Sequence, residues 1–146
     1  MKIIDFENQT NLVVNMDILE KIAQSLTTKE LELIIIDNTS MQELNQEHRN
    51  KNRATDVLSF PMDAPFTEPS IFGMPLGSIV ICADFVREKA DEFGHTLQDE
   101  LSLLFIHGLL HLLGFDHETD EGEMREREKE IIKALDLPSS LIVRTN

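Results

Sequence analysis

The distribution of apolar positions along the chain predicts four short strands. The run LELIIID is rich in Leu and Ile, which is typical of a strand that is buried in a sheet. Pro61 ends the third strand, and residues 62–75 contain enough Pro and Gly to predict a loop before the fourth. The strands are predicted at residues 2–7, 31–37, 57–60 and 76–81.

Five segments with helical spacing of their apolar residues predict helices. Asn15 is placed to cap the first helix, and Ser40 with Glu43 three residues later forms a capping-box pattern at the start of the second. Gly94 ends the third helix. Thr96 caps the fourth, which is apolar on nearly every side and is therefore expected in the core. The helices are predicted at residues 16–26, 40–49, 83–94, 97–113 and 119–135.

The resulting order β-α-β-α-β-β-α-α-α predicts an α+β fold, in which a small mixed four-stranded sheet is covered by about five helices. A chain of 146 residues that is 41% apolar can form one real core. No shift in composition marks a linker, so we expect a single domain over residues 1–146.

The sequence has no apolar stretch long enough for a signal peptide or a membrane span. Its single cysteine, Cys82, follows an apolar run, so we expect a buried, inert thiol at this position and not a nucleophile. These features predict a soluble, cytoplasmic protein that does not act on membranes.

The net charge of −14 argues against binding a polyanion through overall charge. The charge is unevenly distributed, because residues 118–130 carry seven acidic side chains against three basic ones. Residues 49–53, in contrast, contain three basic side chains and no acid. A polyanion is therefore expected to bind near Arg49, Lys51 and Arg53, and not on the C-terminal helix.

The segment HGLLHLLGFDH, residues 107–117, carries the candidate chemistry. His107 and His111 are four residues apart, so on a helix their rings lie one above the other, about 6 Å apart along the axis. Gly114 can adopt the positive φ that ends a helix sharply, so that the chain can return and bring His117 to the same point. Three imidazoles leave an open coordination position, as in catalytic zinc sites. The sequence therefore predicts one Zn²⁺ bound by these three histidines.

The histidines and the acidic residues near them also have interpretations that involve no metal. A histidine pair alone on so apolar a helix would more often belong to the core, and it is the third histidine that favours a metal site. Glu100 lies on the same helical face as His107, but about 10 Å away along the axis it is out of ligand range. Asp116 is a candidate to orient an imidazole by a hydrogen bond, and otherwise a turn residue.

The spacing H-x-x-x-H-x-x-G-x-x-H is also that of the metzincin proteases. Those enzymes need a general-base Glu directly after the first histidine, and here that position is Gly108. The metal-binding spacing is therefore present without the base that peptide hydrolysis requires.

Arg49 is predicted at the end of a helix, shortly before the third strand. Alone it would be a solvated charge. Near a metal centre, an arginine can bind phosphate oxygens in a bidentate manner and stabilise charge that develops in phosphoryl chemistry. Lys51 and Arg53 are candidates for positioning phosphates, or are simply exposed.

Taken together, the histidine block, the run TDVLSFP at residues 55–61 and the segment at residues 76–82 resemble the YbeY family of endoribonucleases. These are rRNA maturation and ribosome quality-control factors of bacteria, and the resemblance covers essentially the whole chain. In this sequence Ser78 stands where the family usually has Asp, and His48 stands where another aromatic residue is usual.

The resemblance implies a zincin-like fold and a zinc-dependent, single-strand-specific endoribonuclease that acts near the 3′ end of 16S rRNA. It implies that His107, His111 and His117 are the zinc ligands, that Arg49 is the critical catalytic arginine, and that components of the small ribosomal subunit are partners. Two alternatives stay open: a non-catalytic, zinc-containing ribosome-assembly factor and, less favoured, a zinc metalloprotease. The nucleophile is either a water molecule or the ribose 2′-OH.

Overall fold

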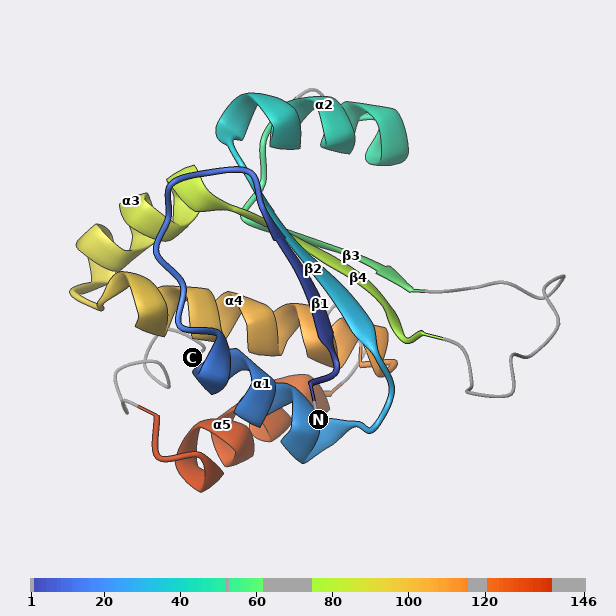
Figure 1. The fold of residues 1–146 in the computed structure, drawn as a ribbon, viewed down its shortest axis with the longest axis vertical. Helices are drawn as coiled ribbons and strands as arrows, with labels where there is room; N and C mark the ends of the chain where they lie inside the picture. Colours follow the sequence, from blue (N-terminus) through green and yellow to red (C-terminus); the bar gives the residue numbers. More distant parts are fainter. Residues whose placement is uncertain (1, 52, 62–74, 116–120, 138–146) are drawn as a thin grey trace, which may run out of the picture.

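The computed structural model describes residues 2–51, 53–61, 75–115 and 121–137 (Figure 1). Within these ranges the strands and helices follow one another in the predicted order, and the fold is α+β as expected. The elements are β1 (Ile4–Asn8), α1 (Met16–Leu26), β2 (Leu31–Ile36), α2 (Asn38–Arg49), β3 (Val57–Pro61), β4 (Gly77–Cys82), α3 (Ala83–Phe93), α4 (Leu97–Leu112) and α5 (Glu123–Ala134).

The four described strands form one mixed sheet in the order β1-β2-β4-β3. β1 pairs with β2, and β2 with β4, in parallel, whereas β3 pairs with β4 in the antiparallel direction. The predicted mixed four-stranded sheet is thus confirmed. β3 is an edge strand of this sheet, with β4 on one side only.

The alternation of side chains along the strands divides the apolar core between the two faces of the sheet. Leu33 and Ile35 of β2 belong to the larger cluster, which α1, α4 and α5 cover. Ile34 and Ile36 belong to the smaller cluster, which lies on the face covered by α2 (Figure 1). The sheet therefore lies between α2 on one face and α1, α4 and α5 on the other.

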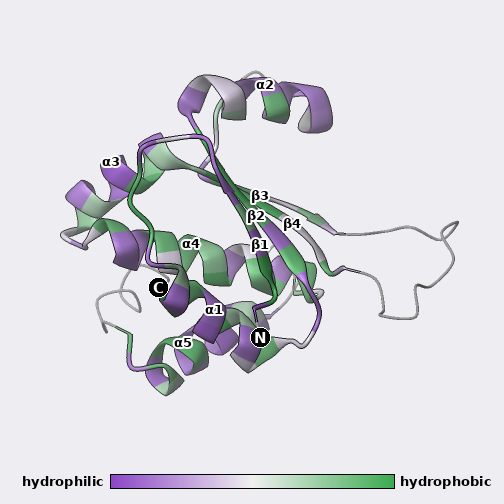
Figure 2. Cartoon of the chain, in the orientation of Figure 1, coloured by the Kyte–Doolittle hydropathy of each residue, from purple (hydrophilic) through white to green (hydrophobic). Residues whose placement is uncertain are grey.

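The most apolar helix, α4, lies in the core as predicted, and eleven of its 16 residues are buried. In Figure 2 it is hydrophobic over most of its length, whereas α2 and α5 present hydrophilic residues outward. Cys82 at the end of β4 is fully buried, and this burial raises the pKa of its thiol, in agreement with the inert role expected for it.

A buried carboxylate fixes the start of β1. Glu20 of α1 is only 6% exposed and accepts hydrogen bonds from the backbone N–H groups of Ile3 and Ile4, at 3.0 and 2.9 Å. Burial alone would raise the pKa of Glu20, but the hydrogen bonds from Ile3, Gln24 and Ile4 outweigh it and hold the pKa below its ordinary value.

The predicted start of the second helix is wrong. The N-cap of α2 is Asp37, whose side chain accepts a hydrogen bond from the backbone N–H of Ser40 at 2.8 Å, so the helix begins at Asn38 and not after Ser40. The carboxylate was assigned to the end of the preceding strand, but it can cap the helix because that strand ends one residue earlier, at Ile36.

The last helix also begins later than predicted. Gly122 has a φ of 103°, which is incompatible with an α-helix, and α5 therefore starts at Glu123. The other boundaries differ from the predicted ones by two residues or fewer. The loop predicted at residues 62–75 lies almost entirely outside the described residues. None of the helices within the described ranges is long and apolar enough to cross a membrane.

Candidate functional site

His107 and His111 lie on successive turns of α4, as their spacing predicts. Their ring centroids are 4.9 Å apart, and the ring planes make an angle of 75°. The side chain of His107 is 31% exposed, although its neighbours along the helix are buried. The two imidazoles therefore form a compact, partly accessible pair at the surface of a core helix.

The end of α4 confirms the role predicted for Gly114. This residue has a φ of 103°, and its backbone N–H donates to the carbonyl oxygen of His111 at 3.0 Å. The N–H of Phe115 reaches back to the carbonyl oxygen of Leu110, also at 3.0 Å. Together these two bonds form a Schellman motif, which turns the chain sharply away from the helix axis. The remaining predicted site residues of this segment, Asp116 and His117, lie outside the described residues.

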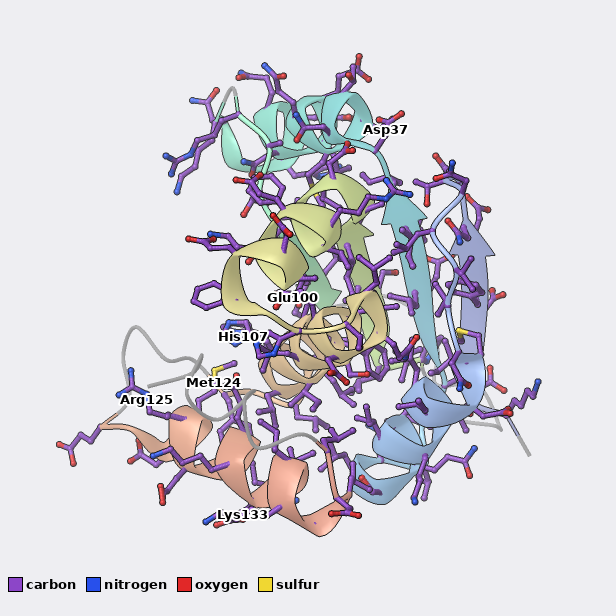
Figure 3. All side chains as sticks on the ribbon, turned by 90° about the vertical axis from the view of Figure 1, so that its left-hand side faces the viewer. Asp37, Glu100, His107, Met124, Arg125 and Lys133 are labelled. Atoms are coloured by element: carbon purple, nitrogen blue, oxygen red, sulfur yellow. The ribbon has the colours of Figure 1, made fainter. Side chains whose placement is uncertain are left out.

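A residue that the sequence analysis missed, Glu128, completes the described part of the site. Its Oε1 lies 2.6 Å from Nδ1 of His107, and the residue is only 3% exposed. Figure 3 shows His107 on the side of the molecule where α5 begins, together with Met124, which lies one turn before Glu128. A signal existed in the sequence, because Glu128 interrupts the apolar stripe that Met124 and Ile131 form on α5.

The contact with Glu128 determines which nitrogen of His107 could bind a metal. An ionised carboxylate can only accept a hydrogen bond, so Nδ1 carries the proton and Nε2 is the nitrogen for a metal. Metal-binding histidines in proteins are commonly held in this way by a carboxylate. The chemistry of the described donors thus fits a divalent metal such as zinc.

The described residues do not by themselves contain a complete metal site. Among them, no group of three or more His, Cys, Asp or Glu side chains is arranged to hold a metal ion. Of the three predicted ligands, His107 and His111 are described and lie together, and His117 lies outside the described ranges.

Gly108, next to His107, faces the sheet. Its carbonyl oxygen accepts a hydrogen bond from Ser59 Oγ at 3.0 Å. A Cβ atom at this position would lie 2.9 Å from Cγ2 of Ile79, 3.2 Å from Ser59 Oγ and 3.3 Å from Cγ2 of Val57. A glutamate could not be accommodated there without displacing α4 from β3 and β4. The position of the protease base is therefore occupied by helix–sheet packing.

The basic segment at residues 49–53 follows the end of α2. Asn50 adopts a left-handed conformation with a φ of 56°, and its N–H donates to the carbonyl oxygen of Gln46 at 3.1 Å. Lys51 and Arg53 are exposed. Arg49 is the last residue of α2, and its side chain is outside the described part of the structure.

Asn45 holds this segment in place, a role that the sequence analysis did not identify. It is only 2% exposed, and its Nδ2 donates to the carbonyl oxygen of Arg53 at 2.8 Å. The backbone carbonyl oxygen of Asn45 accepts a hydrogen bond from the backbone N–H of Lys51, at 3.4 Å between nitrogen and oxygen. One buried side chain therefore connects the last turn of α2 to the chain that leads into β3.

The serine at position 78 has a neighbour that explains it. Ser78 Oγ donates to Oε1 of Glu32 at 2.8 Å, and the two residues are register partners on β4 and β2. An aspartate at position 78 would place two carboxylates on neighbouring strands, and such like charges destabilise a sheet. Glu32 thus makes serine the more suitable residue here.

Comparison with known proteins identifies the family. The family model described as Endoribonuclease YbeY matches residues 2–136. The chain belongs to the YbeY family. The family resemblance inferred from the motifs is therefore confirmed.

Similar YbeY proteins cover nearly the full length of the chain. The chain is 66% identical over 144 residues to the Endoribonuclease YbeY of a Sulfurovum species, covering 99% of this chain and 98% of the relative. It is 59% identical to that of Sulfurimonas denitrificans, with coverages of 97% and 98%. The solution structure of TM1509 from Thermotoga maritima is similar in fold, with a TM-score of 0.59 and 29% identity, over 90% of this chain and 88% of the other.

Proposed function

We propose that this protein is a zinc-dependent, single-strand-specific endoribonuclease that acts in the cytoplasm. It would cleave 16S rRNA near the 3′ end, in rRNA maturation and ribosome quality control. Components of the small ribosomal subunit would be its partners. Membership of a family named for endoribonuclease activity supports the reaction class. The observation that carries the metal dependence is the imidazole pair with a buried carboxylate on Nδ1 of His107.

His107, His111 and His117 would bind one Zn²⁺. When bound, the metal would supply Lewis acidity toward the phosphate group. Glu128 keeps the ring of His107 in a fixed orientation, and Asp116 would orient a neighbouring imidazole in the same way. Three imidazoles and no thiolate are a donor set that suits zinc.

The basic segment would bind the substrate. Arg49 would donate hydrogen bonds to the non-bridging oxygens of the scissile phosphate and stabilise the negative charge that develops there. Lys51 and Arg53, which are exposed beside it, would bind flanking phosphates. The nucleophile is either water or the ribose 2′-OH, and only the second leaves a 2′,3′-cyclic phosphate, which analysis of the product ends detects.

The alternatives differ in what they require of the site. A metalloprotease needs a general base after the first histidine, and the contacts of Gly108 with the sheet argue against one. A non-catalytic assembly factor needs the zinc ligands but no transition-state role for Arg49. Arg49 therefore separates an enzyme from a binding protein.

The test combines zinc content with cleavage of a defined single-stranded RNA at saturation. We expect about one equivalent of zinc in the wild type and in Arg49→Ala, and most of it to be lost in His111→Ala. Arg49→Ala should cut the cleavage rate constant by roughly 100-fold or more. Lys133→Ala, which removes an exposed charge toward the far end of α5, should cleave like the wild type (Figure 3).

Three outcomes would contradict the proposal. Full retention of zinc in His111→Ala would disprove the histidine site. Cleavage by Arg49→Ala at the wild-type rate would favour the assembly factor. Zinc-dependent proteolysis of casein that disappears in His107→Ala would favour the protease.

A further inference from the structure

An aromatic pair connects the end of α2 to the edge strand β3. The rings of His48 and Phe60 are 5.2 Å apart between centroids, in an edge-to-face arrangement with an angle of 63° between the planes. His48 is exposed, and Phe60 is half-buried at the margin of the smaller apolar cluster. In an edge-to-face pair the edge of one ring covers only one face of the other ring, and His48 is exposed, so an aromatic ligand can stack on the surface that remains.

His48 and Phe60 are each next in sequence to a residue that belongs to the candidate site or contacts it. His48 directly precedes Arg49 on α2. Phe60 directly follows Ser59, whose hydroxyl contacts the carbonyl oxygen of Gly108 next to His107. Because side chains alternate along a strand, Ser59 faces α4 and Phe60 faces α2, so the edge of β3 lies between the histidines and the aromatic pair.

The charges around the pair favour a nucleic-acid strand on one side only. Lys51 and Arg53 are exposed just beyond His48 and can bind phosphates. Glu43 and Glu47, in contrast, line a shallow hollow on α2. Their negative charges would repel the phosphates of a nucleic acid. A strand that follows the basic segment therefore passes the aromatic pair.

We propose that His48 and Phe60 form a stacking site for one nucleobase of single-stranded RNA, beside the basic segment at residues 49–53. The inference rests on the proposed function and adds to it a base-binding position. Every base has a π-face, so the site would favour unpaired bases without selecting a sequence. A double-stranded substrate, whose bases are stacked on one another, could not use it.

The experiment compares two single-stranded ligands with the same number of phosphates. One is a short 2′-O-methyl oligouridylate, and the other is an abasic oligomer of equal length. Binding of each is measured by fluorescence anisotropy for the wild type and for His48→Ala, His48→Phe, Phe60→Leu and Lys51→Ala. Thermal unfolding of each variant is recorded alongside.

We expect the wild type to bind the oligouridylate roughly 5-fold or more tightly than the abasic oligomer. His48→Ala and Phe60→Leu should lose most of this preference, and His48→Phe should retain it because a phenyl ring stacks without a charge. Lys51→Ala should weaken the binding of both ligands by a similar factor. Phe93→Leu is the matched control, because Phe93 is 43% exposed and also lies against a histidine, His95, at 6.2 Å between ring centroids.

The proposal is overturned if folded His48→Ala keeps the preference of the wild type, or if it weakens both ligands equally, as a purely structural pair would. It is also overturned, without loss of the proposed function, if the wild type cleaves RNA but binds both ligands alike. A wild type that neither binds nor cleaves RNA would contradict the proposed function itself.

Discussion

Among the single side chains, Glu128 makes a direct contact with the histidine pair. Its carboxylate is buried, and its Oε1 lies 2.6 Å from Nδ1 of the His107 imidazole. A carboxylate in this position fixes the orientation of the ring and makes its other nitrogen a better electron donor. The affinity of the site for a metal should therefore depend on a residue that does not touch the metal.

We expect Glu128→Gln to weaken zinc binding by about 10- to 100-fold, because the neutral amide fills the same space without the negative charge. Competition with a chelator of known affinity measures the effect. Glu130→Gln is the matched control, because Glu130 is exposed on the same helix and pairs with Arg127 at 3.0 Å. Equal zinc affinities of the two variants would show that Glu128 does not support the metal site.

Among the helices and strands, the contact between α4 and the edge of the sheet determines where the histidines lie. Gly108 allows this contact, since any Cβ atom there would be within 3.3 Å of three side-chain atoms of β3 and β4. The same contact brings Ser59 to the helix backbone. The position of the site thus depends on the absence of a side chain.

Gly108→Ala should destabilise the protein by about 1–3 kcal/mol, the usual cost of adding a methyl group to a packed interface. Urea unfolding measures the change. The sign of this change in the free energy of unfolding is informative, because in an exposed helix alanine is more stable than glycine by about 1 kcal/mol. An unchanged or higher stability would mean that α4 does not pack closely on β3 and β4 at this residue.

The attachment of β1 to α1 should depend on pH. The folded-state pKa of Glu20 lies below its ordinary value, so the stabilisation is present above the unfolded-state pKa and is lost as the pH falls through the folded-state value. We expect Glu20→Gln to be less stable than the wild type at neutral pH, with the difference shrinking in acid. Melting temperatures over this pH range test it, and the exposed Glu88→Gln serves as control. A difference that grows in acid would contradict the assigned sign.

The start of a helix was predicted well where only one residue of the sequence suited the N-cap position. Asn15 and Thr96 are unrivalled caps, and α1 and α4 begin where they indicate. At α2, Asp37 and Ser40 both suit an N-cap, and the pattern could not rank them. Glu128 was missed because it is one of four glutamates in α5. Its place in the apolar stripe of the helix was the signal of burial, and the packing of α5 on α4 shows its partner, His107.

For the protein as a unit, the charge distribution limits how RNA can bind. A net charge of −14 repels a polyanion everywhere except near a local cluster of cations. The three basic residues at positions 49–53 form such a cluster in the sequence, and the structure shows Lys51 and Arg53 exposed after the end of α2. Binding should therefore involve few phosphates.

We expect the logarithm of the RNA affinity to fall with the logarithm of the salt concentration with a slope of about −2, as for three neutralised phosphates of a single strand. Anisotropy titrations at several KCl concentrations measure the slope, and Lys51→Ala should make it shallower. A slope steeper than about −4 would indicate a more extensive basic surface than the described residues provide.

The unequal division of the core by the sheet has a consequence for how the protein opens. The larger cluster contains 24 buried apolar residues among those described, and the smaller cluster five. Local opening requires less free energy where fewer apolar contacts must be broken, so amide hydrogens of α2 should exchange with solvent well before those of α4. We therefore expect the end of α2 that carries Arg49 to open readily and α4, with its two histidines, to exchange slowly. A substrate that binds at both places should then slow exchange mainly in α2.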